Sequence, residues 1–201
     1  MMKRGFDIVV SLTALILLIP LMVVAATIIK LDSEGPVFFK QKRIGKGFRP
    51  FWIYKFRTMR KRYSGEGPQV TIGNDPRITR MGWFLRQTKI DELPQLINIL
   101  RGEMSFVGPR PEVPRYVQLF QQDYREILTV RPGLTDLASL KYRDEAALLA
   151  RATNPEEEYT TRVLPDKIEL AKDYLRQASL LFDLKIICKT FFRLFEFRTT
   201  S

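Results

Sequence analysis

Two adjacent carboxylates, Asp91 and Glu92, lie shortly before a proline in the segment Ile-Asp-Glu-Leu-Pro-Gln-Leu at 90–96. On a helix, neighbouring side chains project about 100° apart, so the two acids cannot both point at one atom and we expect them to do different work. The helix predicted to begin just after them favours an ionised carboxylate here. An ionised Asp91 is a usable nucleophile or metal ligand, whereas acids that only cap a helix are the commoner fate of such a pair.

Two arginines in the surrounding sequence provide candidate phosphate ligands. Arg86 precedes Asp91 by five residues, and Arg110 lies between Pro109 and Pro111. Guanidinium groups suit bidentate contacts with phosphate, and the prolines predict a stiff loop that holds Arg110 in place. Acids beside arginines suggest phosphoryl transfer, in which Mg²⁺ offsets charge between a carboxylate and phosphates.

The composition limits the classes of chemistry. The formal net charge is +11, from 33 Lys and Arg against 22 Asp and Glu, and it indicates a polyanionic partner such as nucleic acid, anionic lipid headgroups or a phosphorylated substrate. The chain contains no His, which excludes histidine general bases, Ser-His-Asp triads and His-ligated metal sites. The single cysteine, Cys188, cannot form an internal disulfide, and we interpret it as a packed thiol. Acid–base chemistry therefore falls to carboxylates, Lys or Tyr.

An uncharged apolar run at 8–29 is about as long as the ~20 residues that a helix needs to cross a bilayer. Three readings are open: a cleaved signal peptide, a straight spanning helix, and a re-entrant helix that breaks at Pro20 and returns to the same face. Lys3 and Arg4 precede the run, and Lys30 follows it. Because positive flanks tend to stay in the cytoplasm, charge at both ends favours the re-entrant helix.

The remaining pattern predicts an α+β fold that is mostly helical, with one small β-hairpin. The hairpin is predicted at 37–59, around Gly45-Lys46-Gly47, and a loop at 63–76. Helices are predicted from Thr79 onward and over 93–100, 144–151 and 166–177, and an amphipathic, aromatic and basic helix over 184–195 suits either a membrane interface or the core. We therefore divide the chain into a re-entrant membrane helix at 1–34 and a cytoplasmic catalytic domain, with interfacial helices, at 35–201.

Several linked motifs together resemble one family. They are GPVFFKQKRIG at 35–45, KFRTM at 55–59, DPRITR at 75–80, FLR at 84–86, DELPQL at 91–96 and SFVGPRPE at 105–112. In this order they resemble the bacterial sugar transferases, which are monotopic polyprenyl-phosphate phosphoglycosyl transferases, and the chain is similar to their minimal catalytic unit.

This resemblance implies a specific reaction. A sugar-1-phosphate passes from a UDP-sugar to undecaprenyl phosphate, in two steps through a covalent phosphoglycosyl-aspartate, and gives undecaprenyl-diphospho-sugar and UMP. Such a reaction is the first membrane step in assembling a glycoconjugate such as O-antigen, capsule, exopolysaccharide or a glycoprotein glycan. The resemblance also implies Mg²⁺, a helix broken at Pro20, and attachment to the bacterial inner membrane with the catalytic domain on its cytoplasmic face.

The family's residue roles carry over onto matching positions. The resemblance implies that Asp91 is the nucleophile and metal ligand, and that Glu92 assists attack by the lipid phosphate or the metal site. It further implies that Arg86 binds phosphate and that Arg110 contacts the nucleotide diphosphate. Four more residues belong to the same predicted site: Lys55, Arg57, Pro109 and Pro111.

Two places depart from the family pattern, and one other class of function stays open. Just before the predicted break, the chain has Ile19-Pro20 where some relatives have Ser-Pro. Many members read Pro-Gly-Ile-Thr-Gly-Trp-Ala-Gln where this chain has Pro-Gly-Leu-Thr-Asp-Leu-Ala-Ser at 132–139. We expect this region to shape sugar choice, so the sugar stays open, as does the oligomeric state. The alternative is a non-catalytic, basic, membrane-attached module that binds anionic lipid or nucleic acid. The acids beside Arg86 argue against a nucleic-acid partner, because they would repel a polyanion.

Overall fold

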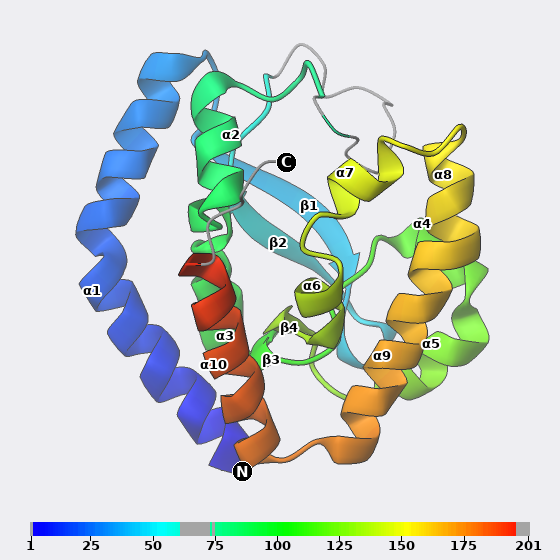
Figure 1. Ribbon diagram of the computed structural model, residues 1–201. Coiled ribbons are helices and arrows are strands. Elements are labelled where there is room, and N and C mark those ends of the chain that lie inside the picture. Colours follow the sequence, from blue (N-terminus) through cyan, green and yellow to red (C-terminus); the bar gives the residue numbers. More distant parts are fainter. Residues whose placement is uncertain (1, 61–72, 74, 196–201) are drawn as a thin grey trace.

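The computed structural model describes residues 2–60, 73 and 75–195, and most of them are helical (Figure 1). This confirms the predicted α+β, mostly helical class. The loop predicted at 63–76 lies largely outside the described residues. The described helices and strands are α1 (Met2–Asp32), β1 (Phe38–Ile44), β2 (Pro50–Phe56), α2 (Arg80–Gln87), α3 (Gln95–Arg101), β3 (Ser105–Val107), α4 (Pro114–Leu119), α5 (Gln121–Ile127), β4 (Gly133–Thr135), α6 (Leu137–Lys141), α7 (Glu145–Leu149), α8 (Pro155–Glu158), α9 (Leu164–Gln177) and α10 (Leu180–Phe195).

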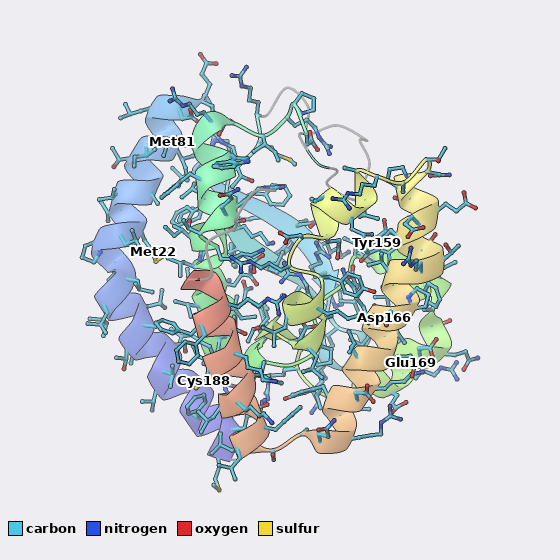
Figure 2. All side chains as sticks on the ribbon, viewed as in Figure 1. Met22, Met81, Tyr159, Asp166, Glu169 and Cys188 are labelled. Carbon is cyan, nitrogen blue, oxygen red and sulfur yellow. The ribbon has the colours of Figure 1, made fainter. Side chains whose placement is uncertain are left out.

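The apolar run forms one long helix, α1, of 31 residues. Its mean hydropathy reaches 2.9, so α1 is long and apolar enough to cross a membrane. Pro20 lies inside α1, and the helix continues through it and bows midway along its length, near Met22 (Figures 1 and 2). Proline removes one backbone hydrogen bond and displaces the preceding turn, which bends a helix without having to end it.

Both ends of α1 are fixed to the same globular body. Near the N-terminal end, the Asp7 carboxylate accepts hydrogen bonds from the Ser105 hydroxyl and the Phe106 N–H, both at 3.1 Å. Just past the C-terminal end, Arg57 donates to the Glu34 and Ser33 carbonyls, each at 2.6 Å. The outward side of α1 between these ends carries exposed apolar side chains: Ile8, Val9, Leu12, Ile16, Leu17, Ile19, Leu21, Val23 and Val24.

The predicted hairpin is confirmed as the antiparallel pair β1–β2, in a register that runs from Phe38 opposite Phe56 to Ile44 opposite Pro50. Alternation along β2 places Phe51, Ile53 and Lys55 on one face. Phe51 and Ile53 are buried in a core cluster with Leu96, Ile99 and Met104 of the α3 region. Lys55 therefore extends this buried face at the end of the strand.

A short parallel pair, β3–β4, holds the proline-rich loop that follows β3. The Gly133 N–H donates to the Pro109 carbonyl at 3.0 Å, and the Gly108 N–H donates to the Thr135 carbonyl at 3.2 Å. A Cβ atom on Gly133 would lie 2.2 Å from the Gly108 nitrogen, so the two backbones can meet this closely only because glycine occupies the position.

The predicted helices at 144–151 and 166–177 correspond to α7 and to the longer α9, which packs with α4, α5 and α7 around a second core. The C-terminal helix α10 buries Ile186 against Val107 and Tyr174, while Phe191 and Phe192 are exposed. Cys188 is also exposed on α10 (Figure 2), so the interpretation as a packed thiol was wrong. The apolar spacing predicted the helix correctly, but it did not show that the Cys188 side chain lies beside the buried face of α10 and not within it.

Candidate active site

The two adjacent acids lie in a tight 3-10 turn, Ile90–Glu92, just before α3 begins at Gln95. Lys89 enters this turn with φ 59°, a left-handed conformation that reverses the chain sharply after α2. The Asp91 and Glu92 side chains are both buried, 6% and 9% exposed. The acids are therefore positioned by a corner between two helices and are not part of a regular helix.

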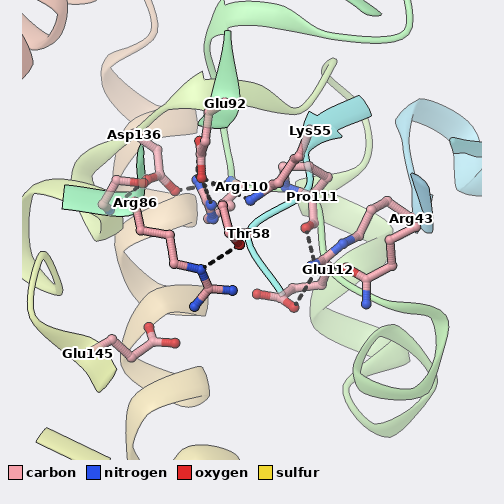
Figure 3. Close-up of polar contacts among 12 residues, drawn as sticks. Arg43, Lys55, Thr58, Arg86, Glu92, Arg110, Pro111, Glu112, Asp136 and Glu145 are labelled. Carbon is pink, nitrogen blue, oxygen red and sulfur yellow. Dashed lines mark hydrogen bonds and ion pairs between the residues drawn. The ribbon is translucent and has the colours of Figure 1, made fainter. Parts of the chain in front are cut away.

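Glu92 is saturated by two cations. Its Oε1 accepts from the Lys55 ammonium at 2.9 Å and from an Arg110 terminal nitrogen at 2.7 Å (Figure 3). The second Arg110 terminal nitrogen lies 3.5 Å from Oε2. Burial alone would raise the pKa of Glu92, but the Arg110 and Lys55 charges outweigh it and hold this pKa well below its usual range. Glu92 is thus an ionised anchor that holds two cations beside Asp91.

Asp91 has the opposite electrostatic balance. Its Oδ1 atom is buried and has no hydrogen-bond partner among the residues that the structure describes. Burial raises the pKa of Asp91, and the nearby charges of Lys55, Lys89 and Arg86 only partly counter this. We expected the following helix to favour the ionised form, and the raised pKa runs the other way, because desolvation dominates in this corner. Asp91 Oδ1 is therefore a buried carboxylate oxygen without a hydrogen-bond partner among the described residues.

Arg86 and Lys55 bring positive charge to Asp91 from two different elements. α2 follows its N-cap residue, Thr79, whose hydroxyl accepts from the Gly82 N–H at 2.9 Å. In the last turn of α2, the Arg86 Nε donates to the Thr58 hydroxyl at 2.9 Å, which leaves both terminal guanidinium nitrogens directed away from this contact (Figure 3). Burial lowers the pKa of Arg86 and that of Lys55, because both charged groups are poorly hydrated.

Arg110 is fixed through its backbone. Its N–H donates to Asp136 Oδ2 at 3.0 Å, and the next carbonyl, of Pro111, accepts from Arg43 at 3.0 Å. Pro109 is held by the β3–β4 pair through its carbonyl. The rigid loop inferred from the prolines is thus tied at three successive residues, and it aims the Arg110 guanidinium at Glu92.

The structure brings together Lys55, Arg86, Asp91, Glu92 and Arg110, with Pro109 and Pro111 on either side of Arg110. It places Arg57 elsewhere: the guanidinium of Arg57 contacts the carbonyls at the end of α1, and Pro20 lies within α1 itself.

Sequence reasoning missed three residues that support this site. Thr58 holds Arg86, Arg43 holds the Pro111 carbonyl, and Asp136 holds the Arg110 N–H. Thr58 and Arg43 lie inside the motif blocks at 55–59 and 35–45, whereas Asp136 lies in the segment at 132–139 that departs from the family pattern. Position within a motif was therefore an available signal for Thr58 and Arg43, and no motif marked Asp136.

The residues present fit one mode of Mg²⁺ binding. No group of three or more Asp, Glu or Cys side chains that could hold a metal occurs among the described residues. Mg²⁺ commonly takes only one or two protein carboxylates and completes its shell with water and substrate phosphates. The unpaired Asp91 Oδ1 suits that mode, whereas Glu92 Oε1 is occupied by both Lys55 and Arg110.

A small cavity lies behind the Arg110 loop, with Glu112, Asp136 and Lys167 among its lining residues. Its volume of about 20 Å³ is room for about one water molecule. A larger ligand must therefore approach Asp91 from outside this cavity.

Residues 1–197 match the family model described as bacterial sugar transferase. The chain belongs to this family. The resemblance seen in the motifs is thus confirmed, and the acid pair with its neighbouring cations lies in a member of this family.

Curated relatives match nearly the whole chain. A UDP-N-acetylgalactosamine-undecaprenyl-phosphate N-acetylgalactosaminephosphotransferase from Aeromonas hydrophila is 41% identical over 94% of this chain and 42% of its own length. A UDP-glucose:undecaprenyl-phosphate glucose-1-phosphate transferase from Escherichia coli is 36% identical over 96% of this chain and 40% of its own length. An exopolysaccharide production protein from Rhizobium leguminosarum is 40% identical over 94% of this chain and 92% of its own length. The chain therefore spans less than half of the first and second of these relatives and nearly all of the third.

Proposed function

We propose that this bacterial sugar transferase moves a sugar-1-phosphate from a UDP-sugar to undecaprenyl phosphate and releases UMP. The names of the relatives from Aeromonas hydrophila and Escherichia coli support the reaction class. The observation that carries the proposal is the contrast between two adjacent carboxylates: Glu92 is saturated by cations, whereas Asp91 keeps a buried oxygen unpaired among them.

In the first step, a carboxylate oxygen of Asp91 attacks the phosphorus next to the sugar. The new bond is between Asp91 and phosphorus, and the bond that breaks joins this phosphorus to the oxygen that leaves with UMP. Arg86, Arg110 and Lys55 offset the charge of the diphosphate and of the departing UMP, and their poorly hydrated setting strengthens each interaction. A covalent phosphoglycosyl-aspartate remains.

In the second step, an oxygen of the lipid phosphate attacks the same phosphorus, and the bond to Asp91 breaks. The products are undecaprenyl-diphospho-sugar and a regenerated carboxylate. A phosphate monoester is already largely ionised near pH 7, since its second pKa is about 6, so its attack requires little help from a base. Glu92, ionised and doubly paired, therefore suits the role of holding Lys55 and Arg110 better than that of a general base.

Asp91 is the residue that would hold Mg²⁺, together with phosphate oxygens of the donor. When bound, the ion would neutralise charge on the diphosphate and on the leaving group. Before a donor binds, Glu92 already holds Lys55 and Arg110, so the chain itself builds the cationic side of the site.

The same proposal includes attachment to the inner membrane through a re-entrant α1, with the catalytic domain on the cytoplasmic face. The contacts that support it are those of Asp7 near one end of α1 and of Arg57 just past the other, both with one charged body that a bilayer core would not admit. A straight crossing would require one of these ends to leave that body. The exposed apolar side of α1 would face lipid.

The test uses the full chain in lipid nanodiscs with Mg²⁺, undecaprenyl phosphate and a panel of UDP-sugars that includes UDP-glucose and UDP-N-acetylgalactosamine. We expect UMP release from at least one donor. With sugar-labelled donor and no lipid phosphate, label should remain on the protein, and Asp91→Asn should remove it. Folded protein that releases no UMP from any donor would overturn the enzymatic proposal and favour the non-catalytic, lipid-binding alternative.

A further inference from the structure

Asp136 joins two backbone segments with its two carboxylate oxygens. It follows β4 directly and is 4% exposed. Its Oδ2 accepts from the Arg110 N–H at 3.0 Å, and its Oδ1 accepts from the Ser139 N–H at 2.7 Å, which caps the start of α6 (Figure 3). One buried side chain thus ties the Arg110 loop to α6.

The opposite side of Arg110 is held by a half-buried cation, Arg43. Arg43 donates to the Pro111 carbonyl at 3.0 Å and is itself held by Gln41 at 2.7 Å and by Glu112 at 3.4 Å. Proline fixes φ and has no N–H, so few degrees of freedom remain in this loop. With the Asp136 contact in place, the backbone on both sides of the Arg110 Cα atom is fixed.

This backbone attachment matters because the Arg110 side chain has to change partners. Without substrate, the guanidinium of Arg110 pairs with Glu92 at 2.7 Å. A diphosphate would compete for the same guanidinium nitrogens. If the backbone were loose, much of the gain from a new phosphate contact would be lost in ordering the loop. A loop fixed through its N–H and the neighbouring carbonyl lets the side chain move while its Cα atom stays in place.

We propose that Asp136 is a positioning residue for Arg110: by holding the Arg110 N–H, it keeps the guanidinium in reach of the donor's diphosphate. This inference rests on the proposed function for the ligand and on the two Asp136 contacts for the geometry. Asp136 thus links Arg110, which would contact the diphosphate, to α6, in the region expected to shape sugar choice.

A simpler role for Asp136 is that it only caps α6. Asp136→Asn separates the two roles, because the amide has nearly the same shape but only one oxygen. It cannot accept from both the Arg110 and Ser139 N–H groups, and its NH₂ would face one of these donors. Asn154→Ala is the matched control, since the Asn154 side chain accepts from the Glu157 N–H at 3.3 Å and caps α8. It removes a helix cap without touching Arg110.

The decisive measurement is a double-mutant cycle on UDP binding, with UDP as the probe and Arg110→Gln as the second variant. Lys55 and Arg86 remain in Arg110→Gln to bind UDP. We expect Asp136→Asn to weaken UDP binding about tenfold in the otherwise native chain, or about 1.4 kcal/mol, because Arg110 would lose part of one charge-assisted contact. In the Arg110→Gln background we expect less than about a twofold change. The KM for the UDP-sugar should rise, while the KM for undecaprenyl phosphate should not.

Equal loss in both backgrounds would overturn the inference, because Asp136 would then act without Arg110. Hydrogen exchange provides an independent measurement, since Arg110 has the only amide between Pro109 and Pro111. Its exchange should accelerate in Asp136→Asn and stay unchanged in Asn154→Ala, and slow exchange in Asp136→Asn would also refute the tether. If the native chain neither binds UDP nor releases UMP, the proposed function fails, whereas the exchange result still decides whether Asp136 holds Arg110.

Discussion

Replacing each of the two adjacent acids by its amide should change stability in opposite ways. Glu92→Gln removes the charge that pairs with Lys55 at 2.9 Å and with Arg110 at 2.7 Å, and it leaves two poorly hydrated cations without their anion. Breaking one side of a buried ion pair costs about 3–5 kcal/mol. For a chain of this size 1 kcal/mol corresponds to about 2–4 °C, so we expect the unfolding midpoint to fall by roughly 10 °C.

Asp91→Asn should not lower the midpoint, although it removes a charge only one residue away. Burial raises the pKa of Asp91, which means that the folded state disfavours the charged form, and no hydrogen bond to Oδ1 is lost among the described residues. An amide of the same shape is therefore tolerated or slightly stabilising. The same variant should abolish labelling by the donor, so stability and activity separate at this position.

The assay is thermal unfolding in nanodiscs, followed by helical circular dichroism at pH 7.5. Glu169→Gln is the control, because the Glu169 ion pair with Lys172 is exposed and should contribute less than about 1 kcal/mol. The reasoning is refuted if Glu92→Gln behaves like Glu169→Gln, or if Asp91→Asn lowers the midpoint as much as Glu92→Gln does.

Three further outcomes follow from the same contacts. The folded-state pKa of Glu92 lies below its ordinary value of 4.5, so ionised Glu92 stabilises the fold fully above pH 4.5 and loses this effect as pH falls through the lower folded value. Unfolding midpoints of the native chain and of Glu92→Gln, measured at pH 3–8, should therefore converge only in acid. Arg57→Met should lower the unfolding midpoint but leave the KM for the UDP-sugar unchanged, since Arg57 donates to carbonyls just past α1; a raised KM would return Arg57 to the substrate site. Gly133→Ala should prevent stable folding, because its Cβ atom would lie 2.2 Å from the Gly108 nitrogen. The Cβ atom of Gly47→Ala meets open space, so this variant should lose only about 1 kcal/mol of stability for its φ of 65°. Expression and thermal unfolding measure both variants.

Periodicity and turn residues predicted the elements well, and the contacts between distant elements poorly. The hairpin and the helices that follow Thr79 and Pro94 were all readable, because each depends on neighbours in the chain. Lys55 and Arg57 are an example of side chains whose contacts could not be predicted from strand alternation. They are two residues apart, so one strand would direct both to the same side. β2 ends at Phe56, however, and the chain then turns Arg57 toward α1, while Lys55 stays beside Glu92.

The supporting residues could not be predicted for a different reason. Asp136 is 26 residues from Arg110, and Arg43 is 68 residues from Pro111. Such pairs are set by how β1, β3 and β4 assemble and leave no periodic signal in the sequence. The acids themselves were identified because their neighbours form a dense local motif, and the different charge states of Asp91 and Glu92 became visible only once Lys55 and Arg110 were placed.

The long apolar helix α1 contacts the segments that carry Lys55 and Arg110. Near its N-terminal end, Asp7 binds Ser105 and Phe106 of β3, the strand that leads into the Arg110 loop. Just past its C-terminal end, the carbonyls of Ser33 and Glu34 bind Arg57, two residues after Lys55. In the proposed reaction, a lipid phosphate would reach the site at a depth set by the bilayer, and α1 is the element that the bilayer would hold. Because α1 is joined to both cation-bearing segments, Lys55 and Arg110 keep a fixed height relative to α1, and thus to an incoming lipid phosphate in the proposed reaction.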